Sequence, residues 1–474
     1  MTTKDPYRPL LQNTLAHALD YLDNLKQSSV SATAEYDDLV SQLNHMLPDE
    51  GVDSEKVIGD LVKDIRGGLL GSAGGRFFGW VIGGAVPASL AADWLTSTWD
   101  QNAAIYAGSP AEAVIEEICG TWLKDLLRLP PSVSFALVTG CQMAHVTCLA
   151  AARHHILAEK GWNVEENGLA GSPRIRILTG SHRHGTIDRA VRLLGMGSNA
   201  VIDLPLDENG RLTPEVLNKA LIGQPETATI VLMQAGDLNI GAYDPFIELI
   251  PIAHQYNAWV HIDGAFGLWA AASPQYRHLL DGCETADSWA TDGHKWLNVP
   301  YDCGYAFVAH PDAHSASMSY RASYMVQATQ ARDQMDWNPE WSRRGRGVAT
   351  YATIRQLGRQ GIADIVERTC GFAHDLVTRI GALPGAQMVW EPQINQGLVR
   401  YLDPKPDATE ADHDRWTDQI IAEIQKTGEA FFGGTTWNGK RCMRVSVCNW
   451  QTNADDVDRS VAAVQKVLAG HKIL

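Results

Sequence analysis

The stretches ATIVLMQAG (228–236) and AWVHIDGAF (258–266) decide the fold class of this 474-residue chain. Each is a short apolar run of the kind that forms a buried strand, and RIRILTG (174–180) and GYAFVAH (304–310) repeat the pattern. Sequence with helical periodicity separates these runs. Buried strands that alternate with helices predict an α/β fold with a mostly parallel central sheet, in which ligands bind beyond the carboxyl ends of the strands.

We expect three regions along the chain. Residues 1–110 read as a helical N-terminal segment that ends in Gly-rich apolar sequence. Residues 111–315 carry the alternating pattern of the large α/β domain. Residues 316–474 begin with a polar, Arg-rich loop and continue into a small α+β domain, with MRVSVCN (443–449) as one strand.

Composition excludes several classes of function. The 39 basic and 55 acidic residues give a formal net charge of −16, which argues against nucleic acid as the main partner. No apolar run reaches the ~20 residues of a membrane span, and the N-terminus lacks a signal-peptide pattern. The eight cysteines show neither a disulfide framework nor the paired spacing of a zinc site. We therefore expect a cytoplasmic enzyme with no membrane, nucleic-acid or metal partner.

Two residues stand out as candidates for chemistry. Asp263 follows the apolar run AWVHI, and a carboxylate at the end of a buried strand needs a cationic partner or hydrogen bonds. A turn cap would also satisfy it. Lys295 lies in apolar, aromatic sequence, where desolvation would lower its pKa and make it a nucleophile that forms a Schiff base with a carbonyl. A solvated surface charge is the alternative for Lys295.

Two further segments suit an anionic, planar cofactor. TGCQMAH (139–145) follows an apolar run and opens a helix, so its free backbone N–H groups would suit a phosphate. It lacks both the Walker lysine and a dinucleotide-binding fingerprint. His184, in SHRHGTID (181–188), can stack on a planar ring. A Schiff-base lysine, a carboxylate, a stacking imidazole and a phosphate site are together what pyridoxal 5'-phosphate requires.

Four motifs resemble one enzyme family. HIDGAF (261–266) and DGHKWLNVPYDCG (292–304) are similar to paired elements of the group II pyridoxal-phosphate-dependent amino acid decarboxylases, which include aromatic amino acid and glutamate decarboxylases. RFFGWVIGGAVPASLAADWL (76–95) and QNAAIYAGSPAEAVIEE (101–117) resemble two N-terminal elements of the same family. The resemblance implies the aspartate-aminotransferase fold (fold type I) and a mobile loop at the start of the third region.

The resemblance also implies roles for individual residues. Lys295 would form the Schiff base with the cofactor, Asp263 would pair with the pyridinium nitrogen and His184 would stack on the ring. The other cofactor-binding residues would be Ala265, Cys141, Gln142, His294 and Asp292. The family is homodimeric with shared active sites, so the substrate pocket would be lined by Trp80, Val81, Ile82 and Gly83, with Asn102 and Ala104 from the partner subunit.

The implied reaction is decarboxylation of an L-amino acid by a carboxy-lyase. In this family a tyrosine on the mobile loop often reprotonates Cα, but residues 327–341 contain no tyrosine. Gln334 is nearest to that position, and Tyr324 lies ten residues earlier. Loss of that tyrosine accompanies aldehyde formation in the family. The alternatives are therefore an aldehyde-forming decarboxylase or oxidative deaminase, a Cα–Cβ lyase, and a scaffold that binds cofactor without turnover.

The substrate is open at this stage. The pocket segments are mostly apolar with one tryptophan, which favours an apolar or aromatic substrate side chain over glutamate. Arginines in SRRGRG (342–347) would instead suit a carboxylate, or would face the surface or a phosphate. Asp237 replaces the family's usual threonine and would either hold a cationic substrate group or form structural hydrogen bonds.

Overall fold

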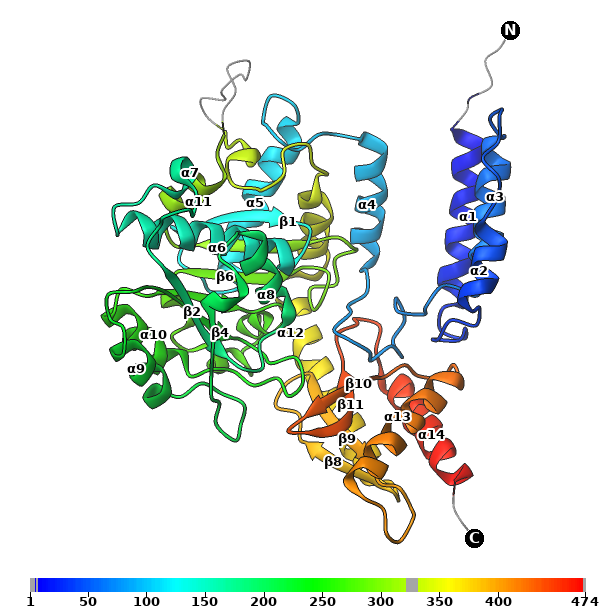
Figure 1. Cartoon of the computed structure of the whole chain (residues 1–474). Coiled ribbons are helices and arrows are strands. Elements are labelled where there is room, and N and C mark those ends of the chain that lie inside the picture. The colour runs from blue at the N-terminus through cyan, green and yellow to red at the C-terminus, as the bar shows by residue number, and fades with distance from the viewer. Residues whose placement is uncertain (1–4, 6, 321–330, 472–474) are drawn as a thin grey trace.

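The computed structural model describes residues 5, 7–320 and 331–471 (Figure 1). Tyr324 and residues 327–330 of the predicted loop lie outside the described residues. Within the described part of the chain, no helix is long and apolar enough to cross a membrane.

A seven-stranded sheet forms the centre of the large body in Figure 1. The strand order is β1-β7-β6-β5-β4-β2-β3. The strands are β1 (Ser134–Val138), β2 (Ile175–Gly180), β3 (Val201–Leu204), β4 (Ala228–Gln234), β5 (Trp259–Asp263), β6 (Ser288–Asp292) and β7 (Gly304–Val308). The pairs from β3 through β6 are parallel, whereas β7 runs antiparallel to both β6 and β1. The predicted α/β fold with a mostly parallel sheet is therefore confirmed.

Both faces of this sheet are buried except at the edge strand β3, which explains why the inner strands β2, β4 and β5 are mostly apolar. Val231 and Ile262 belong to the core cluster on one face, and Ile230 and Leu232 belong to the cluster on the other. Neighbouring residues of a strand point to opposite faces, so each strand serves two cores. Strand β6 was missing from the expected runs because its sequence, SWATD, contains three polar residues.

Helices cover the sheet on both sides (Figure 1). The α-helices of this region are α4 (Pro87–Trp99), α5 (Pro110–Leu126), α6 (Cys141–Ala158), α7 (Val164–Asn167), α8 (Gly185–Leu193), α9 (Pro214–Ile222), α10 (Phe246–Gln255) and α11 (Pro311–Met318). Short 3-10 helices are η1 (Ser198–Ala200), η2 (Gly267–Ala272), η3 (Arg277–Leu280), η4 (Cys283–Thr285) and η5 (Gln334–Asp336). Helix α12 (Arg346–Gly381) is broken at Gly358, where φ is 58°, and leads into the C-terminal part.

The C-terminal part has its own antiparallel sheet with the order β10-β11-β9-β8. Its strands are β8 (Ala386–Trp390), β9 (Gln396–Tyr401), β10 (Gly433–Trp437) and β11 (Lys440–Ser446). Helices α13 (Glu410–Lys426) and α14 (Ala454–Gly470) complete it. The strand predicted at MRVSVCN (443–449) overlaps β11, which ends at Ser446.

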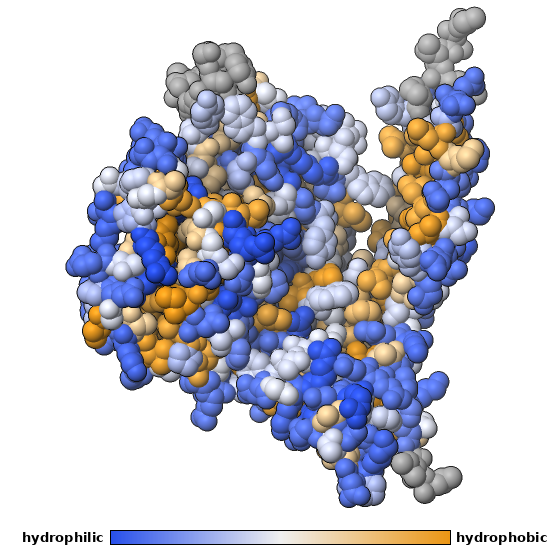
Figure 2. Space-filling view, viewed as in Figure 1, coloured by the Kyte–Doolittle hydropathy of each residue, from blue (hydrophilic) through white to orange (hydrophobic). Residues whose placement is uncertain are grey.

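The N-terminal helices form an arm that stands apart from the body (Figure 1). They are α1 (Arg8–Asn24), α2 (Tyr36–Leu43) and α3 (Ser54–Asp64). Leu11, Leu15 and Leu19 share one side of α1 and are 44–52% exposed. Figure 2 shows apolar side chains gathered along the arm on the side turned toward the body. Apolar residues at helical spacing usually pack against another protein surface, and on this arm they are exposed.

Asn298 joins three distant segments around the predicted lysine. Its side-chain oxygen accepts hydrogen bonds from the backbone N–H of Gly84 (2.7 Å) and of Trp450 (3.0 Å). Its amide donates to the carbonyls of Trp296 (2.8 Å) and Cys448 (3.0 Å). Asn298 is fully buried and has a φ of 59°, a conformation that asparagine tolerates better than most residues. The N-terminal segment, the lysine loop and the C-terminal part therefore meet at one side chain.

We expect Asn298→Ala to lower the free energy of unfolding by about 3 kcal/mol, because several buried backbone groups lose their partners. Guanidinium titration followed by circular dichroism measures the change. Asn438→Ala is the matched control, because Asn438 also has a positive φ (48°) but is exposed in the β10–β11 turn. It should cost about 1 kcal/mol, from backbone conformation alone. Equal losses in the two variants would contradict the role of the Asn298 hydrogen bonds.

Candidate active site

The carboxyl ends of β5 and β6 bring the main candidates together. Asp263 is the last residue of β5 and pairs with Ala290 of the parallel strand β6. An Asp263 carboxylate oxygen accepts a hydrogen bond from the N–H of Ala265 (3.2 Å), and the Ala265 carbonyl accepts one from the N–H of Asp292 (2.9 Å). Asp263, Ala265 and Asp292 therefore form one connected edge, at the side of the sheet where ligands bind in this fold class.

Lys295 is held by Asp292. The Lys295 Nζ lies 2.9 Å from one Asp292 carboxylate oxygen, and the Lys295 side chain is 22% exposed. Burial, the largest single effect, would lower the pKa of Lys295, but the charge and hydrogen bond of Asp292, together with other neighbouring groups that include Asp263, outweigh burial and raise the pKa above its ordinary value. The expected lowered pKa of Lys295 is therefore wrong for the chain without ligand. That expectation rested on desolvation alone and left out the charge of Asp292, three residues away in sequence.

The other oxygen of Asp292 occupies the start of α6. It accepts a hydrogen bond of 2.5 Å from the N–H of Cys141, the first residue of that helix. This oxygen also lies 3.4 Å from Nε2 of His294. A carboxylate therefore already sits where free N–H groups and the helix dipole favour an anion.

Close backbone approach keeps this corner compact. A Cβ on Gly140 would lie 3.1 Å from the His294 ring and 3.3 Å from Asp292, and a Cβ on Gly304 would lie 2.5 Å from the Gly140 backbone. Glycine at both positions lets β7 and the start of α6 come together beside Asp292.

His184 and Gln142 lie at the neighbouring edge of the site. His184 is the N-cap of α8, and its Nδ1 contacts the Thr186 hydroxyl at 2.8 Å. Its ring is partly exposed, yet burial by the surrounding protein still lowers the pKa of His184, which favours the neutral imidazole. The Gln142 side chain donates to the Thr186 carbonyl (3.2 Å), which ties the start of α6 to the start of α8.

His294 is fixed between backbone and ring. Its Nδ1 accepts a hydrogen bond from the N–H of Cys303 (3.2 Å), and its ring stacks on Tyr301 with the centroids 4.3 Å apart. Burial lowers the pKa of His294 below its ordinary value. Because Nδ1 accepts a hydrogen bond, the hydrogen of the neutral ring is on Nε2, and Nε2 faces Asp292.

The predicted pocket segment 80–83 runs beside the lysine. A Cβ on Gly83 would lie 2.0 Å from the Lys295 carbonyl, so only glycine fits there. Val81 packs against the core of the large body, and Ile82 is partly buried. Trp80 is 53% exposed, with its ring 5.4 Å from that of Phe431.

Asn102 and Ala104 lie elsewhere within the same chain. The Asn102 side chain accepts a hydrogen bond from the N–H of Arg343 (3.2 Å), and the Ala104 carbonyl accepts one from the N–H of Met335 (2.9 Å). Both residues therefore contact residues 333–343, which lie mostly within the predicted loop. Gln334 is buried there, and its amide donates to the Ala113 carbonyl at the start of α5 (3.5 Å).

Other charged candidates have structural partners. One Asp237 carboxylate oxygen accepts hydrogen bonds from the N–H groups of Asn239 and Ile240, both 2.8 Å, and the other has no hydrogen-bond partner. Each arginine of SRRGRG (342–347) is paired with an acidic residue: Arg343 with Glu116 (2.6 Å), Arg344 with Asp93 (2.7 Å) and Arg346 with Asp302 (2.9 Å).

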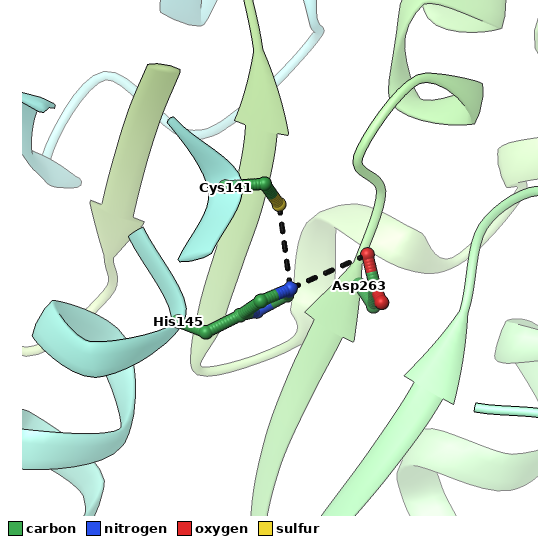
Figure 3. Close-up of side chains that lie close together, drawn as sticks. All are labelled: Cys141, His145 and Asp263. Atoms are coloured by element: carbon green, nitrogen blue, oxygen red, sulfur yellow. Dashed lines mark hydrogen bonds and ion pairs between the residues drawn. The ribbon is translucent and has the colours of Figure 1, made fainter. Parts of the chain in front are cut away.

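Two histidines behind Asp263 were not predicted as site residues from the sequence. His145 is fully buried on α6, and its Nε2 lies 3.6 Å from Asp263 and 3.4 Å from the Cys141 sulfur (Figure 3). His261 is fully buried on β5 and contacts His145. The spacing of Cys141 and His145, one helical turn apart, was a usable signal, because residues i and i+4 of a helix share a face.

Residues 37–401 match the pyridoxal-dependent decarboxylase conserved domain. The chain belongs to this family. It is therefore a pyridoxal-phosphate-dependent carboxy-lyase of amino acid metabolism, as the motifs around Asp263 and Lys295 predicted.

Individual relatives agree with this assignment. The chain is 25% identical over 447 residues to an aromatic-L-amino-acid decarboxylase of Bacillus atrophaeus, a match that covers 93% of this chain and 90% of that protein. It is 24% identical to a 4-hydroxyphenylacetaldehyde synthase of Rhodiola rosea, with coverage of 94% and 91%. The crystal structure of Oryza sativa TDC with PLP and tryptamine has the same fold, with a TM-score of 0.92, 22% identity and 99% of each chain covered.

The residues present fit pyridoxal phosphate. A primary amine, a strand-end carboxylate and an imidazole lie around the start of α6. The Asp292 carboxylate on the N–H of Cys141 shows that this helix start accepts an anionic oxygen, which is what a phosphate needs.

We expect Asp292→Asn to lower the pKa of Lys295, because the variant removes the charge that stabilises the ammonium form. More of the neutral amine would then be present at any given pH, so labelling of Lys295 by an amine-selective reagent should reach its half-maximal rate at a lower pH. Mass spectrometry of the apoprotein measures this profile.

Asp312→Asn, at an exposed position on α11, is the control and should leave the profile unchanged. An unchanged profile in Asp292→Asn would contradict the argument that Asp292 sets the pKa of Lys295.

Proposed function

We propose that this enzyme decarboxylates an L-amino acid with an apolar or aromatic side chain, and that Lys295 is the residue that binds the cofactor covalently. The observation that carries the proposal is the placement of the Lys295 amine, the Asp263 carboxylate and the start of α6 around one edge of the sheet. Amine, carboxylate and helix start correspond to the aldehyde, ring nitrogen and phosphate of the cofactor.

Each residue has a distinct task in this proposal. Pyridoxal phosphate supplies an electron sink for the electron pair that remains on Cα when carbon dioxide leaves. Asp263 would hold the proton on the ring nitrogen, because a buried carboxylate stabilises a neighbouring cation. Ala265 and His184 would contact the ring. The phosphate would be bound by the N–H groups of Cys141 and Gln142 and by His294.

Asp292 would act as a placeholder before the cofactor binds. It holds the Cys141 N–H and the Lys295 ammonium at the same time. A phosphate at Cys141 would displace this carboxylate by charge repulsion and by competition for the same donor. Lys295 would then lose its counter-ion and could more readily give up its proton, as a nucleophile must.

The substrate class rests on the pocket segment and on the relatives. Trp80, Val81 and Ile82 run beside the Lys295 loop and offer apolar surface to a substrate side chain. The arginines of SRRGRG (342–347) are paired within the chain, so they would not supply a free cation for an acidic side chain. Two of the relatives, those of Bacillus atrophaeus and Rhodiola rosea, are named for aromatic compounds, whereas others are named for diaminobutyrate or acidic amino acids.

Aldehyde formation is the second candidate. It is favoured by the absence of a tyrosine in residues 327–341 and by the similarity to an aldehyde synthase. In that reaction the amino acid, oxygen and water give the aldehyde, carbon dioxide, ammonia and hydrogen peroxide. Simple decarboxylation gives only carbon dioxide and the amine, and it consumes no oxygen.

A substrate panel separates these outcomes. Purified holoenzyme would be incubated with tyrosine, tryptophan, phenylalanine, leucine, glutamate and diaminobutyrate while carbon dioxide, amine, ammonia and peroxide are followed. Carbon dioxide with a stoichiometric amine supports the proposal, and equimolar ammonia and peroxide support the aldehyde reaction. Release of no carbon dioxide from any of them would sink both.

We expect Lys295→Ala to abolish turnover and the visible absorption band of bound cofactor, because no other amine would bind the cofactor covalently. Lys219→Ala, at an exposed position on α9, is the control and should retain both. Absorption spectra and borohydride trapping followed by peptide mapping give the readout. A trapped cofactor on another lysine in Lys295→Ala would show that the nucleophile lies elsewhere.

We propose further that two copies of this chain form a homodimer through the N-terminal arm. The exposed stripe of Leu11, Leu15 and Leu19 supports an apolar interface, since such a stripe is costly in water. Asn102 and Ala104 would then reach the substrate site of the partner subunit, as in the family that the chain resembles.

The double variant Leu15→Glu/Leu19→Glu should convert the dimer to monomer and lower turnover, because burying two carboxylates in an apolar interface is unfavourable. Analytical ultracentrifugation measures the mass. Ile222→Glu, which replaces an exposed isoleucine at the end of α9, is the control and should remain dimeric. A fully dimeric double variant would contradict an interface at the arm.

A further inference from the structure

A line of five polar groups ends on Asp263 and lies deeper in the protein than the cofactor-binding residues. The Trp259 indole nitrogen is 2.9 Å from the Ser288 hydroxyl, and the hydroxyl is 2.8 Å from Nδ1 of His261. Nε2 of His261 is 2.9 Å from Nδ1 of His145. Nε2 of His145 faces Asp263 at 3.6 Å (Figure 3). The four residues behind Asp263 are buried in the core of the large body.

The Trp259 indole, which can only donate, and the Asp263 carboxylate, which can only accept, indicate the direction of the hydrogen bonds between them. Ser288 therefore accepts from Trp259 and keeps its own hydrogen available for Nδ1 of His261. A neutral His261 then carries its hydrogen on Nε2 and donates to His145. A neutral His145 in turn presents its Nε2–H to Asp263, where a lone pair would be repelled by the carboxylate.

Both imidazoles are neutral in this arrangement. Burial lowers the pKa of His145 to about 3 and the pKa of His261 well below its ordinary value. The Cys141 thiol beside His145 also stays protonated, because burial and the charges of Asp292 and Asp263 raise its pKa. Asp263 therefore has a row of aligned dipoles behind it, and neither imidazole in that row is charged.

We propose that His145 and His261 are positioning residues that hold the Asp263 carboxylate oriented toward the cofactor's ring nitrogen. This inference rests on the proposed role of Asp263. A neutral donor stabilises a buried carboxylate through a directed dipole, and a second donor polarises the first. An imidazolium at position 145 would instead neutralise Asp263 and weaken its hold on the pyridinium proton. We call Trp259, Ser288, His261 and His145 the relay. Because its two rings are neutral, the relay orients Asp263 without neutralising the charge of the carboxylate.

The three groups in Figure 3 also have the composition of a metal site. Ligand atoms of Cys141, His145 and Asp263 lie within 4.8 Å of one another. The relay accounts for the orientation of His145 without an ion, because the ring is already fixed from behind by His261. Metal analysis of the purified protein separates the two explanations.

The test compares wild-type holoenzyme with His145→Phe, which keeps a ring but removes the donor. Enzyme loaded with 15N-labelled pyridoxal phosphate reports protonation of the ring nitrogen directly by NMR. We expect the 15N signal of His145→Phe to move toward the unprotonated position. We also expect kcat to fall roughly 10- to 100-fold, as for loss of one polar interaction with a charged group, with KM within about twofold.

His145→Gln is the rescue variant, because its amide can present an N–H near the position of Nε2. It should restore the 15N signal and most of kcat. His154→Phe removes a partly buried histidine of the same helix, which pairs with Glu165 away from Asp263, and should match wild type. Should His145→Phe fail to fold, Ser288→Ala tests the far end of the relay and should shift the signal in the same direction.

Several outcomes would overturn the relay. One is a wild-type 15N signal and kcat in His145→Phe, or in Ser288→Ala if that variant is used. Another is one equivalent of bound zinc in wild type that is absent from His145→Phe. Neither outcome touches the role of Lys295. Full turnover by Lys295→Ala would instead overturn the proposed function, whatever the 15N signal shows.

Discussion

The parallel pairing of β5 with β6 is the constraint on which the site depends. It places Asp263 and Asp292 at adjacent strand ends, and the loop after β6 then returns Lys295 to the Asp292 carboxylate. Parallel strands all end at the same edge of the sheet. The Asp263 carboxylate, the Lys295 amine and the start of α6 therefore lie close together there. Asn298 holds this loop against Gly84 of the N-terminal segment and Cys448 of the C-terminal part.

Charge is distributed unevenly across this edge. Asp292 faces a cation and a helix start, so it is stabilised by groups that the cofactor would also use. Asp263 accepts a hydrogen bond from the Ala265 N–H and lies beside the neutral ring of His145, and its interaction with Lys295 is weaker than that of Asp292. The two carboxylates, 29 positions apart in sequence, therefore suit different tasks: one can be displaced, and the other is held in place.

Sequence reasoning predicted the parallel sheet, the family and the strand-end position of Asp263, because each depends on local patterns. It was wrong about the pKa of Lys295, and it gave no account of His145 or His261. The sign of the Lys295 shift depends on a 2.9 Å contact with Asp292, and a sequence pattern carries no such distance. The residues that line the substrate pocket, including Asn102 and Ala104, stay predictions.

The sequence by itself determined which residue types stand at the strand ends and that these strands are buried on both faces, since periodicity and motif spacing are properties of the chain alone. Only the tertiary structure decided what those residues face. Asp292 meets Lys295 and the start of α6, and His145 of a helix meets His261 of a strand 116 positions away. Such contacts set pKa values and hydrogen-bond direction because electrostatic interactions depend on distance in space, which folding creates.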